Sequence, residues 1–142
     1  MINSLESLPL SSDVVIDANI FLYHIMKRPK FFPACNVFLT RIESGSYNGI
    51  TSTLVLNEVL HKLIVAEAAK IYRLHSEQNA VNICSFDETA LDMAVDLSNR
   101  HGLLISDASH LAVMKAQGVT NIATNDSDLP GNSTVSWGSP EK

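Results

Sequence analysis

The stretch that decides the fold is Val14-Val15-Ile16-Asp17-Ala18-Asn19-Ile20-Phe21, or VVIDANIF. Three consecutive β-branched residues, 14 to 16, are typical of a strand that is buried on both faces of a sheet. An aspartate, Asp17, then stands where this strand should end. Because burying a lone carboxylate is costly, such a group is usually paired, hydrogen-bonded or bound to a metal ion. Which of these applies to Asp17 depends on the rest of the chain.

The composition is typical of a soluble globular domain. Of the 142 residues, 46% are hydrophobic and 18% are charged, which excludes a disordered chain and allows one sizeable core. No apolar run is long enough to span a bilayer, and the first residues contain no basic segment of a signal peptide. Cys35 and Cys84 are far apart and form no CxxC motif, so we expect reduced thiols in a cytoplasmic protein without a membrane partner.

The charge balance limits how the chain can meet nucleic acid. A net charge of −5 argues against a protein that grips nucleic acid through a broad basic face. It leaves open a nuclease that reaches phosphates through bound cations. The densest basic run is Lys27-Arg28-Pro29-Lys30. Lys27, Arg28 and Lys30 are candidates for contact with RNA phosphates or a partner, and a solvated turn is the plainer interpretation.

Strand and helix signals alternate along the chain. After the first strand, further strands are expected at 50–52, 81–84, 119–123 and 134–137. Helices are expected at 34–42, 54–64, 68–78, 88–100 and 107–117. Asn48-Gly49 predicts a turn, and Ser52 or Thr53, Asp87 and Ser106 are candidate helix caps. With no repeat or linker, this order predicts one α/β domain over residues 1–142, with a mainly parallel sheet covered by helices on both faces.

Acidic residues from separate parts of the chain are expected at one edge of this sheet. Asp17 ends the first strand, and Asp126 follows the strand at 119–123. Glu58 and Asp107 lie in the first two turns of helices that run antiparallel to the strands, so they fall at the same carboxyl edge. Ligands of open α/β sheets bind there. Asn19 and Asp128 are close enough in sequence to join the group; the expected cluster is Asp17, Glu58, Asp107 and Asp126.

Clustered carboxylates repel and raise one another's pKa unless a positive charge neutralises them. Oxygen-only ligands are what a hard divalent cation such as Mg²⁺ prefers. A bound cation lowers the pKa of its water and stabilises charge on phosphoryl and leaving oxygens. The cluster therefore predicts metal-assisted hydrolysis of phosphodiester bonds.

Four segments resemble the successive motifs of the PIN-domain ribonucleases. They are VIDANIF (15–21), STLVLNEV (52–59), LISDASHLA (104–112) and ATNDSDL (123–129), in the family's order and spacing from about residue 13 to residue 137. The resemblance implies a three-layer α/β/α fold and a ribonuclease that depends on Mg²⁺ or Mn²⁺. By the family pattern the acidic cluster is Asp17, Glu58, Asp107 and Asp126, and Asn19 and Thr124 match accessory polar positions.

The resemblance also implies partners. Many small members of the family are toxins of VapC type, which cleave RNA, are inhibited by a cognate antitoxin and are often homodimers. The sequence departs from the commonest pattern at Ala18, where threonine is frequent, and at Leu129, where phenylalanine is frequent. Neither departure removes a carboxylate.

Each acidic residue also has a plainer interpretation. Asp17 can be a helix cap or turn residue. Glu58 precedes Lys62 by four residues, which favours an ion pair worth about 0.3–0.5 kcal/mol. Asp107 can oppose the dipole of its helix, and Asp126 and Asp128 have a natural turn composition. One shared site explains all of them together.

Other functions have less support in the sequence. A phosphatase that works through an aspartate nucleophile needs a second acid two residues later, where Asn19 stands. A non-catalytic module that binds RNA or protein remains an alternative, and no glycine fingerprint suggests a dinucleotide. His110 lies one helical turn from Asp107 and can reach the site, although a structural histidine is the commoner case. No cluster of histidine and cysteine suggests zinc.

Overall fold

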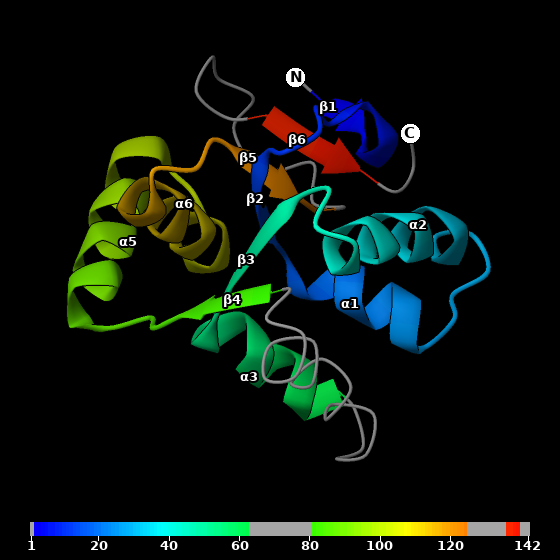
Figure 1. Ribbon diagram of the computed structural model, residues 1–142. Coiled ribbons are helices and arrows are strands. Elements are labelled where there is room, and N and C mark those ends of the chain that lie inside the picture. The colour runs from blue at the N-terminus through cyan, green and yellow to red at the C-terminus, as the bar shows by residue number, and fades with distance from the viewer. Residues whose placement is uncertain (1, 63–80, 125–135, 140–142) are drawn as a thin grey trace.

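A six-stranded sheet forms the centre of the fold, with strand order β1-β6-β5-β2-β3-β4. The computed structural model describes residues 2–62, 81–124 and 136–139. Every pair of neighbouring strands in this sheet is parallel, which confirms the predicted α/β class (Figure 1). The strands are β1 (Ile2–Ser4), β2 (Asp13–Ile16), β3 (Asn48–Ser52), β4 (Val81–Cys84), β5 (Asn121–Ala123) and β6 (Ser136–Ser139).

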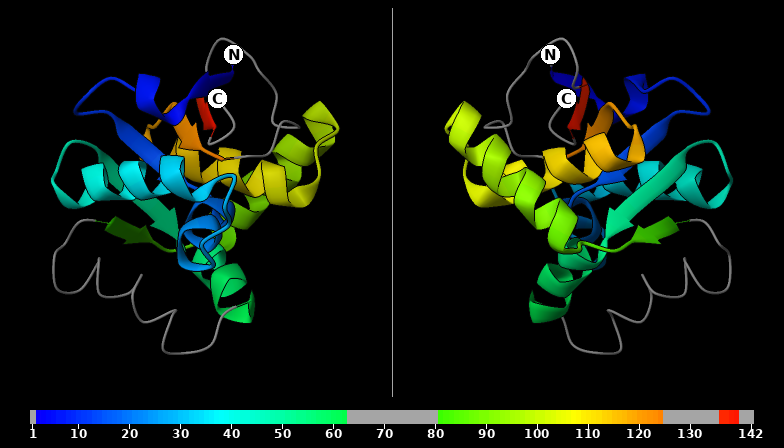
Figure 2. Two further views of the ribbon diagram at one scale, coloured as in Figure 1. Left: turned by 90° about the vertical axis from the view of Figure 1, so that its right-hand side faces the viewer. Right: turned by 90° about the vertical axis from the view of Figure 1, so that its left-hand side faces the viewer.

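Helices cover the sheet on both sides, as Figure 2 shows. On one side lie α1 (Ala18–Ile25) and α2 (Phe32–Glu43), and on the other α5 (Glu88–His101) and α6 (Ile105–Gln117). The remaining described helices are η1 (Leu5–Ser7) and α3 (Thr53–Lys62), which follows β3. The three layers of the predicted α/β/α sandwich are therefore present.

The strand β2 divides the core in two. Val14 and Ile16 pack with residues of α1 and α2, whereas Val15 packs with residues of α5 and α6. Successive residues of a strand point to opposite faces, so a strand covered on both sides must be apolar at every position. This is why the unbroken run Val14 to Ile16 identifies the central strand.

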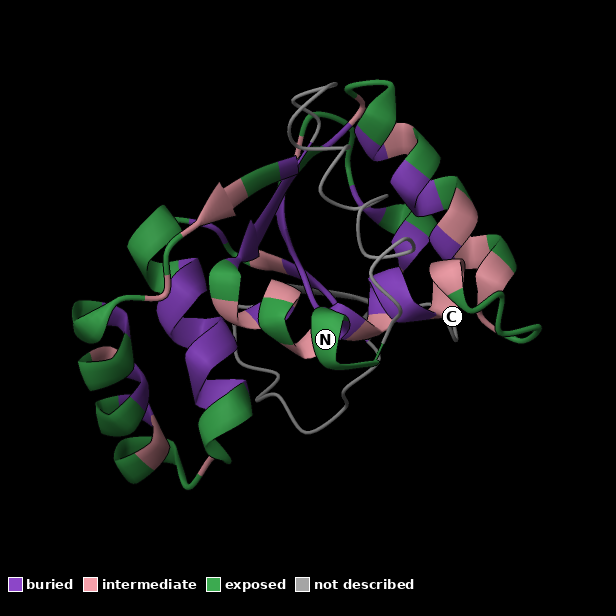
Figure 3. Ribbon diagram, turned by 90° about the horizontal axis from the view of Figure 1, so that it is seen from below, coloured by how far each residue is buried: buried purple, intermediate pink, exposed green. Residues whose placement is uncertain are grey.

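The helix α6 is buried without interruption from Asp107 to Met114, because α5 covers its outer side (Figure 3). Polar residues on such a helix cannot reach solvent freely. Asp107 and His110 are therefore held inside the fold, where they need partners.

Several expectations about local structure are confirmed. Val55 N donates to Ser52 Oγ at 3.2 Å, and Ala90 N donates to Asp87 Oδ1 at 2.9 Å, so both predicted caps form. Both cysteines are free thiols, and burial raises the pKa of Cys35 to about 12. Among the described residues, no helix is long and apolar enough to cross a membrane.

The predicted turn at Asn48-Gly49 is wrong, because both residues lie in β3. A Cβ at Gly49 would lie only 3.0 Å from Ile16 Cδ1 and 3.1 Å from Ile42 Cδ1. The glycine therefore allows close packing of β3 against Ile16 and Ile42, and its flexibility in a turn is not what the fold uses.

Other local predictions also need correction. Ser106 does not cap α6, because the helix begins at Ile105 and no side chain caps it. The sequence pattern does not predict the helix α1, which has only eight residues, most of them apolar, and directly follows an apolar strand. The short elements β1 and η1 were also not predicted. The helix expected at 68–78, and residues 63–64 and 134–135, lie outside the described part of the chain.

Candidate active site

Asp17 lies directly after β2, the strand between β5 and β3, at the carboxyl edge of the sheet. It is the N-cap residue of α1, and its side chain is buried, with 6% of the residue exposed. The strand and the helix together fix its backbone. This is the place at which open α/β sheets bind ligands.

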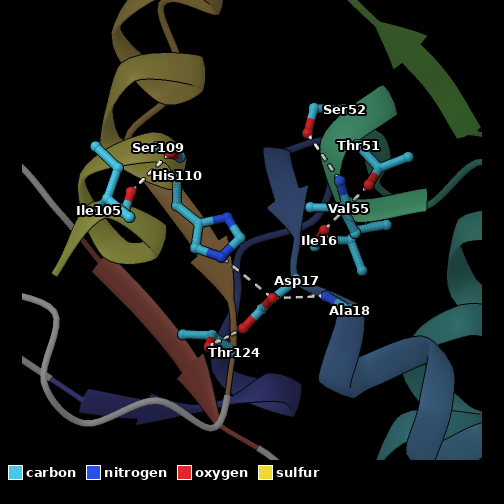
Figure 4. Close-up of polar contacts among 10 residues, drawn as sticks. All are labelled: Ile16, Asp17, Ala18, Thr51, Ser52, Val55, Ile105, Ser109, His110 and Thr124. Atoms are coloured by element: carbon cyan, nitrogen blue, oxygen red, sulfur yellow. Dashed lines mark hydrogen bonds and ion pairs between the residues drawn. The ribbon is translucent and has the colours of Figure 1, made fainter. Parts of the chain in front are cut away.

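Three groups from three parts of the chain contact the Asp17 carboxylate (Figure 4). Ala18 N donates to Oδ1 at 2.6 Å, and Thr124 Oγ1 donates to Oδ2 at 2.8 Å. His110 Nε2 lies 3.2 Å from Oδ1. Asp17 therefore caps a helix, which is the simpler of the two interpretations of this residue. Its contacts with Thr124 and His110, however, are not needed for capping.

These contacts keep Asp17 ionised. Burial alone would raise the pKa of this carboxyl group, but the hydrogen bond and charge of His110, with the bonds from Thr124 and Ala18, lower it below 3.8. The pKa of His110 shifts the other way. Burial lowers it, while the hydrogen bond and charge of Asp17 and the charges of Glu58 and Asp107 together raise it above 6.5.

Three of the four predicted acids therefore raise the pKa of the same histidine, His110. Glu58 is half-buried on α3, and Asp107 is 3% exposed in the first turn of α6. Their negative charges, with that of Asp17, favour the imidazolium form of His110. Within the described ranges, no ion pair joins Glu58 to Lys62, so the plainer interpretation of Glu58 lacks its contact.

The other predicted residues fall in different places. Thr124 is buried and touches Asp17, while Asn19 lies in the first turn of α1 and lines a pocket there. Lys27, Arg28 and Lys30 follow α1 and are exposed. Asp126, Asp128 and Leu129 lie outside the described residues.

His110 is a candidate site residue that the sequence alone favours less than a structural histidine. Its place one turn after Asp107 was the available signal, but contact with Asp17 depends on how α6 packs against the end of β2. In residues 2–62, 81–124 and 136–139, no three histidine, cysteine or acidic side chains are already arranged to hold a metal ion.

Comparison with solved structures shows a shared fold. The VapC20 toxin of Mycobacterium tuberculosis, described as a sarcin–ricin loop cleaving toxin, matches with a TM-score of 0.66 and 18% identity. The match covers 86% of this chain and 96% of that one. A toxin–antitoxin complex from Klebsiella pneumoniae matches with a TM-score of 0.62 and 19% identity, over 86% of this chain and 94% of that one. VapBC2 from Rickettsia felis, bound to a DNA fragment from its promoter, matches with a TM-score of 0.62 and 18% identity. That match covers 89% of this chain and 98% of the other.

Sequence comparison identifies the family. No curated protein matches the sequence at a significant level. The family model of the PIN domain, however, matches residues 14–132, which is most of the chain and includes all four motifs. The chain therefore belongs to the PIN domain family.

Proposed function

We propose that the chain is a divalent-metal-dependent endoribonuclease and the toxin of a toxin–antitoxin pair. The observation that carries this proposal is the ionised, buried carboxylate of Asp17 at the carboxyl end of the central strand, facing a histidine on which Glu58 and Asp107 also act. Membership of the PIN family and the shared fold with VapC-type toxins support it.

The residues fit a hard divalent cation, Mg²⁺ or Mn²⁺. The donors are carboxylate oxygens, and the acids already attract positive charge, since they favour the imidazolium form of His110. We assign Asp17, Glu58, Asp107 and Asp126 to the cation, with Asn19, Thr124 and Asp128 as accessory groups. When bound, the cation supplies Lewis acidity, which makes water a better nucleophile and stabilises negative charge on the phosphate.

The chain's own groups hold Asp17 in one orientation. Ala18 N–H fixes Oδ1 from the start of α1, and the Thr124 hydroxyl fixes Oδ2 from the end of β5. Because these donors belong to the two elements beside the strand end, the carboxylate cannot rotate without breaking a hydrogen bond. Such fixed orientation is what positioning of a reacting phosphate requires.

We also propose that the whole chain forms one domain, that it works in the cytoplasm, and that it pairs with itself and with a cognate antitoxin. These proposals rest on the VapBC complexes among the structural neighbours and on the span of the family match.

The test is cleavage of a mixed pool of structured and single-stranded RNAs with Mn²⁺, Mg²⁺ or EDTA. The wild type should cut the pool with either metal, and EDTA should abolish cutting. Asp17→Asn should be inactive, while Asp13→Asn should remain active. Asp13 is the matched control because it lies exposed at the other end of β2. Its carboxylate accepts from Asn48 Nδ2 at 2.8 Å, and its backbone carbonyl, which the substitution keeps, accepts from Asn121 Nδ2 at 3.1 Å. Unchanged cleavage by Asp17→Asn would contradict the mechanism.

A non-catalytic module that binds RNA or protein is the second candidate. It is favoured by one observation, that both carboxylate oxygens of Asp17 have protein partners. An aspartate-nucleophile phosphatase has no such support, because Asn19 stands where its second acid would be. Failure of the purified protein to bind Mn²⁺ would favour the binding module.

A further inference from the structure

A pocket lies along α1 and is also lined by the last residue of α3. It has a volume of about 400 Å³, within the range of small-ligand sites. Its lining residues are Asn19, Leu22, Tyr23, Met26, Arg28 and Lys62. Four of these follow one face of α1 at spacings of three and four residues. Lys62 lies four residues after Glu58, on the same face of α3, so the pocket continues from the Glu58 side of the candidate active site.

Two cations from different elements meet at this pocket. Arg28 follows α1, and Lys62 is the last residue of α3. Both are exposed, and neither side chain forms an ion pair or hydrogen bond with any described residue. In a chain with a net charge of −5, two positive groups at one pocket that have no partner among the described residues favour an anionic ligand.

The rest of the lining is largely apolar. Leu22 is buried, whereas Met26 is 45% exposed. The ring of Tyr23 stacks on that of Phe31, with centroids 4.4 Å apart, and is therefore held in place. An apolar wall beside cations suits a nucleotide, because the base can pack on the wall while its phosphate meets the charges.

We propose that this pocket binds one nucleotide of the RNA substrate next to the phosphodiester bond that is cut. The inference rests on the proposed ribonuclease function and adds to it a substrate subsite. The base lies against Met26 and Tyr23, and the phosphates contact Arg28 and Lys62. Among the candidates in the basic run, Arg28 lines the pocket. Lys30 instead lies with Nζ 5.2 Å from the centroid of the Phe31 ring.

The experiment is RNA binding in the Asp17→Asn background, which prevents cleavage. The probe is a short, fluorescein-labelled, single-stranded RNA of mixed sequence, followed by anisotropy over a range of salt concentrations. Arg28→Gln and Lys62→Gln should each weaken binding several-fold. Each should also reduce the slope of log affinity against log salt by about 0.7, the value for one phosphate contact on a single strand. Met26→Ala should weaken binding about five-fold or more without changing that slope.

Lys115→Gln is the matched control, because it removes the same charge from an exposed residue in the last turn of α6, which does not line the pocket. It should leave the affinity within about two-fold, below the effect of one lost phosphate contact. Equal weakening by Lys115→Gln and Arg28→Gln would overturn the subsite, since it would mean that only overall charge matters. Unchanged binding in Arg28→Gln and Lys62→Gln would also overturn it.

Failure of the subsite can be distinguished from failure of the proposed function. If the Asp17→Asn parent binds RNA and the pocket variants bind equally well, the subsite alone is wrong. If the wild type neither binds nor cuts RNA, both proposals are wrong. If the pocket variants keep RNA binding but lose binding of a co-purified antitoxin, the pocket receives a protein instead of a nucleotide, and the subsite is wrong.

Discussion

The imidazole of His110 lies against the carboxylate of Asp17, with Nε2 3.2 Å from Oδ1, and so joins α6 to the end of the central strand. Both side chains are about nine-tenths buried. Removing either partner would leave the other group buried without its counter-charge, which is costly. This contact explains how acids can gather at the edge of the sheet in the folded chain.

Replacing His110 by Gln should make stability depend less on pH. The folded pKa of His110 is raised above 6.5 and that of Asp17 is lowered below 3.8, so their pairing is complete between these values. It is lost as pH rises through the folded pKa of His110. In EDTA, urea unfolding should show a loss of about 1–3 kcal/mol near pH 5.5 and a smaller loss near pH 9.

His101→Gln is the control for this measurement, because His101 is exposed at the end of α5. It should change stability little at either pH. A loss in His110→Gln that is the same at both pH values would show that folding does not raise the pKa of His110.

Thr124→Val should reduce RNA cleavage more than stability. The change removes the hydroxyl that donates to Asp17 Oδ2 at 2.8 Å, and about 1 kcal/mol of stability with it. Thr124→Ser should restore activity. Thr51→Val is the matched control, since Thr51 is equally buried on β3 but donates to the Ile16 carbonyl at 3.3 Å. Equal loss of cleavage in both valine variants would remove Thr124 from the proposed site.

Glu58→Gln distinguishes a site residue from a surface ion pair. In the proposed site, the change should lower metal-dependent cleavage strongly while stability stays within about 0.5 kcal/mol, as for most surface substitutions. If Glu58 served only to pair with Lys62, Glu58→Gln and Lys62→Gln would cost the same small stability and leave the chemical step unchanged. Single-turnover cleavage at saturating enzyme measures that step.

Gly49→Ala should destabilise the fold. Its Cβ would press on Ile16 Cδ1 and Ile42 Cδ1, and such overpacking typically costs about 1–3 kcal/mol. Urea unfolding followed by circular dichroism measures the change. A variant as stable as the wild type would mean that β2 and α2 can move apart without cost, and that the glycine is not needed for packing.

The sequence predicts the framework of this fold well. The run Val14 to Ile16 marks the central strand because both of its faces are covered, and Asp87 and Gly102 mark the two ends of α5. Local signals fail where tertiary packing decides. Gly49 has a turn composition but lies in a strand, and α1 is a short helix that directly follows the apolar strand and is itself mostly apolar.

The same limit applies to the candidate site. Asp17 is identifiable from its place after the strand, and Thr124 from its match to the family motif. The contact between His110 and Asp17 joins residues far apart in sequence. The spacing of residues within either segment therefore cannot predict it.

The most direct test of the central claim, that Asp17 holds a divalent cation, is Mn²⁺ binding measured by calorimetry. The wild type and the Asp13→Asn control should bind Mn²⁺ with the same affinity and heat, and Asp17→Asn should bind at least ten-fold more weakly, about 1.4 kcal/mol. Circular dichroism should confirm that all three are folded. Equal Mn²⁺ binding by Asp17→Asn and the wild type, or no binding by any of the three, would contradict the account.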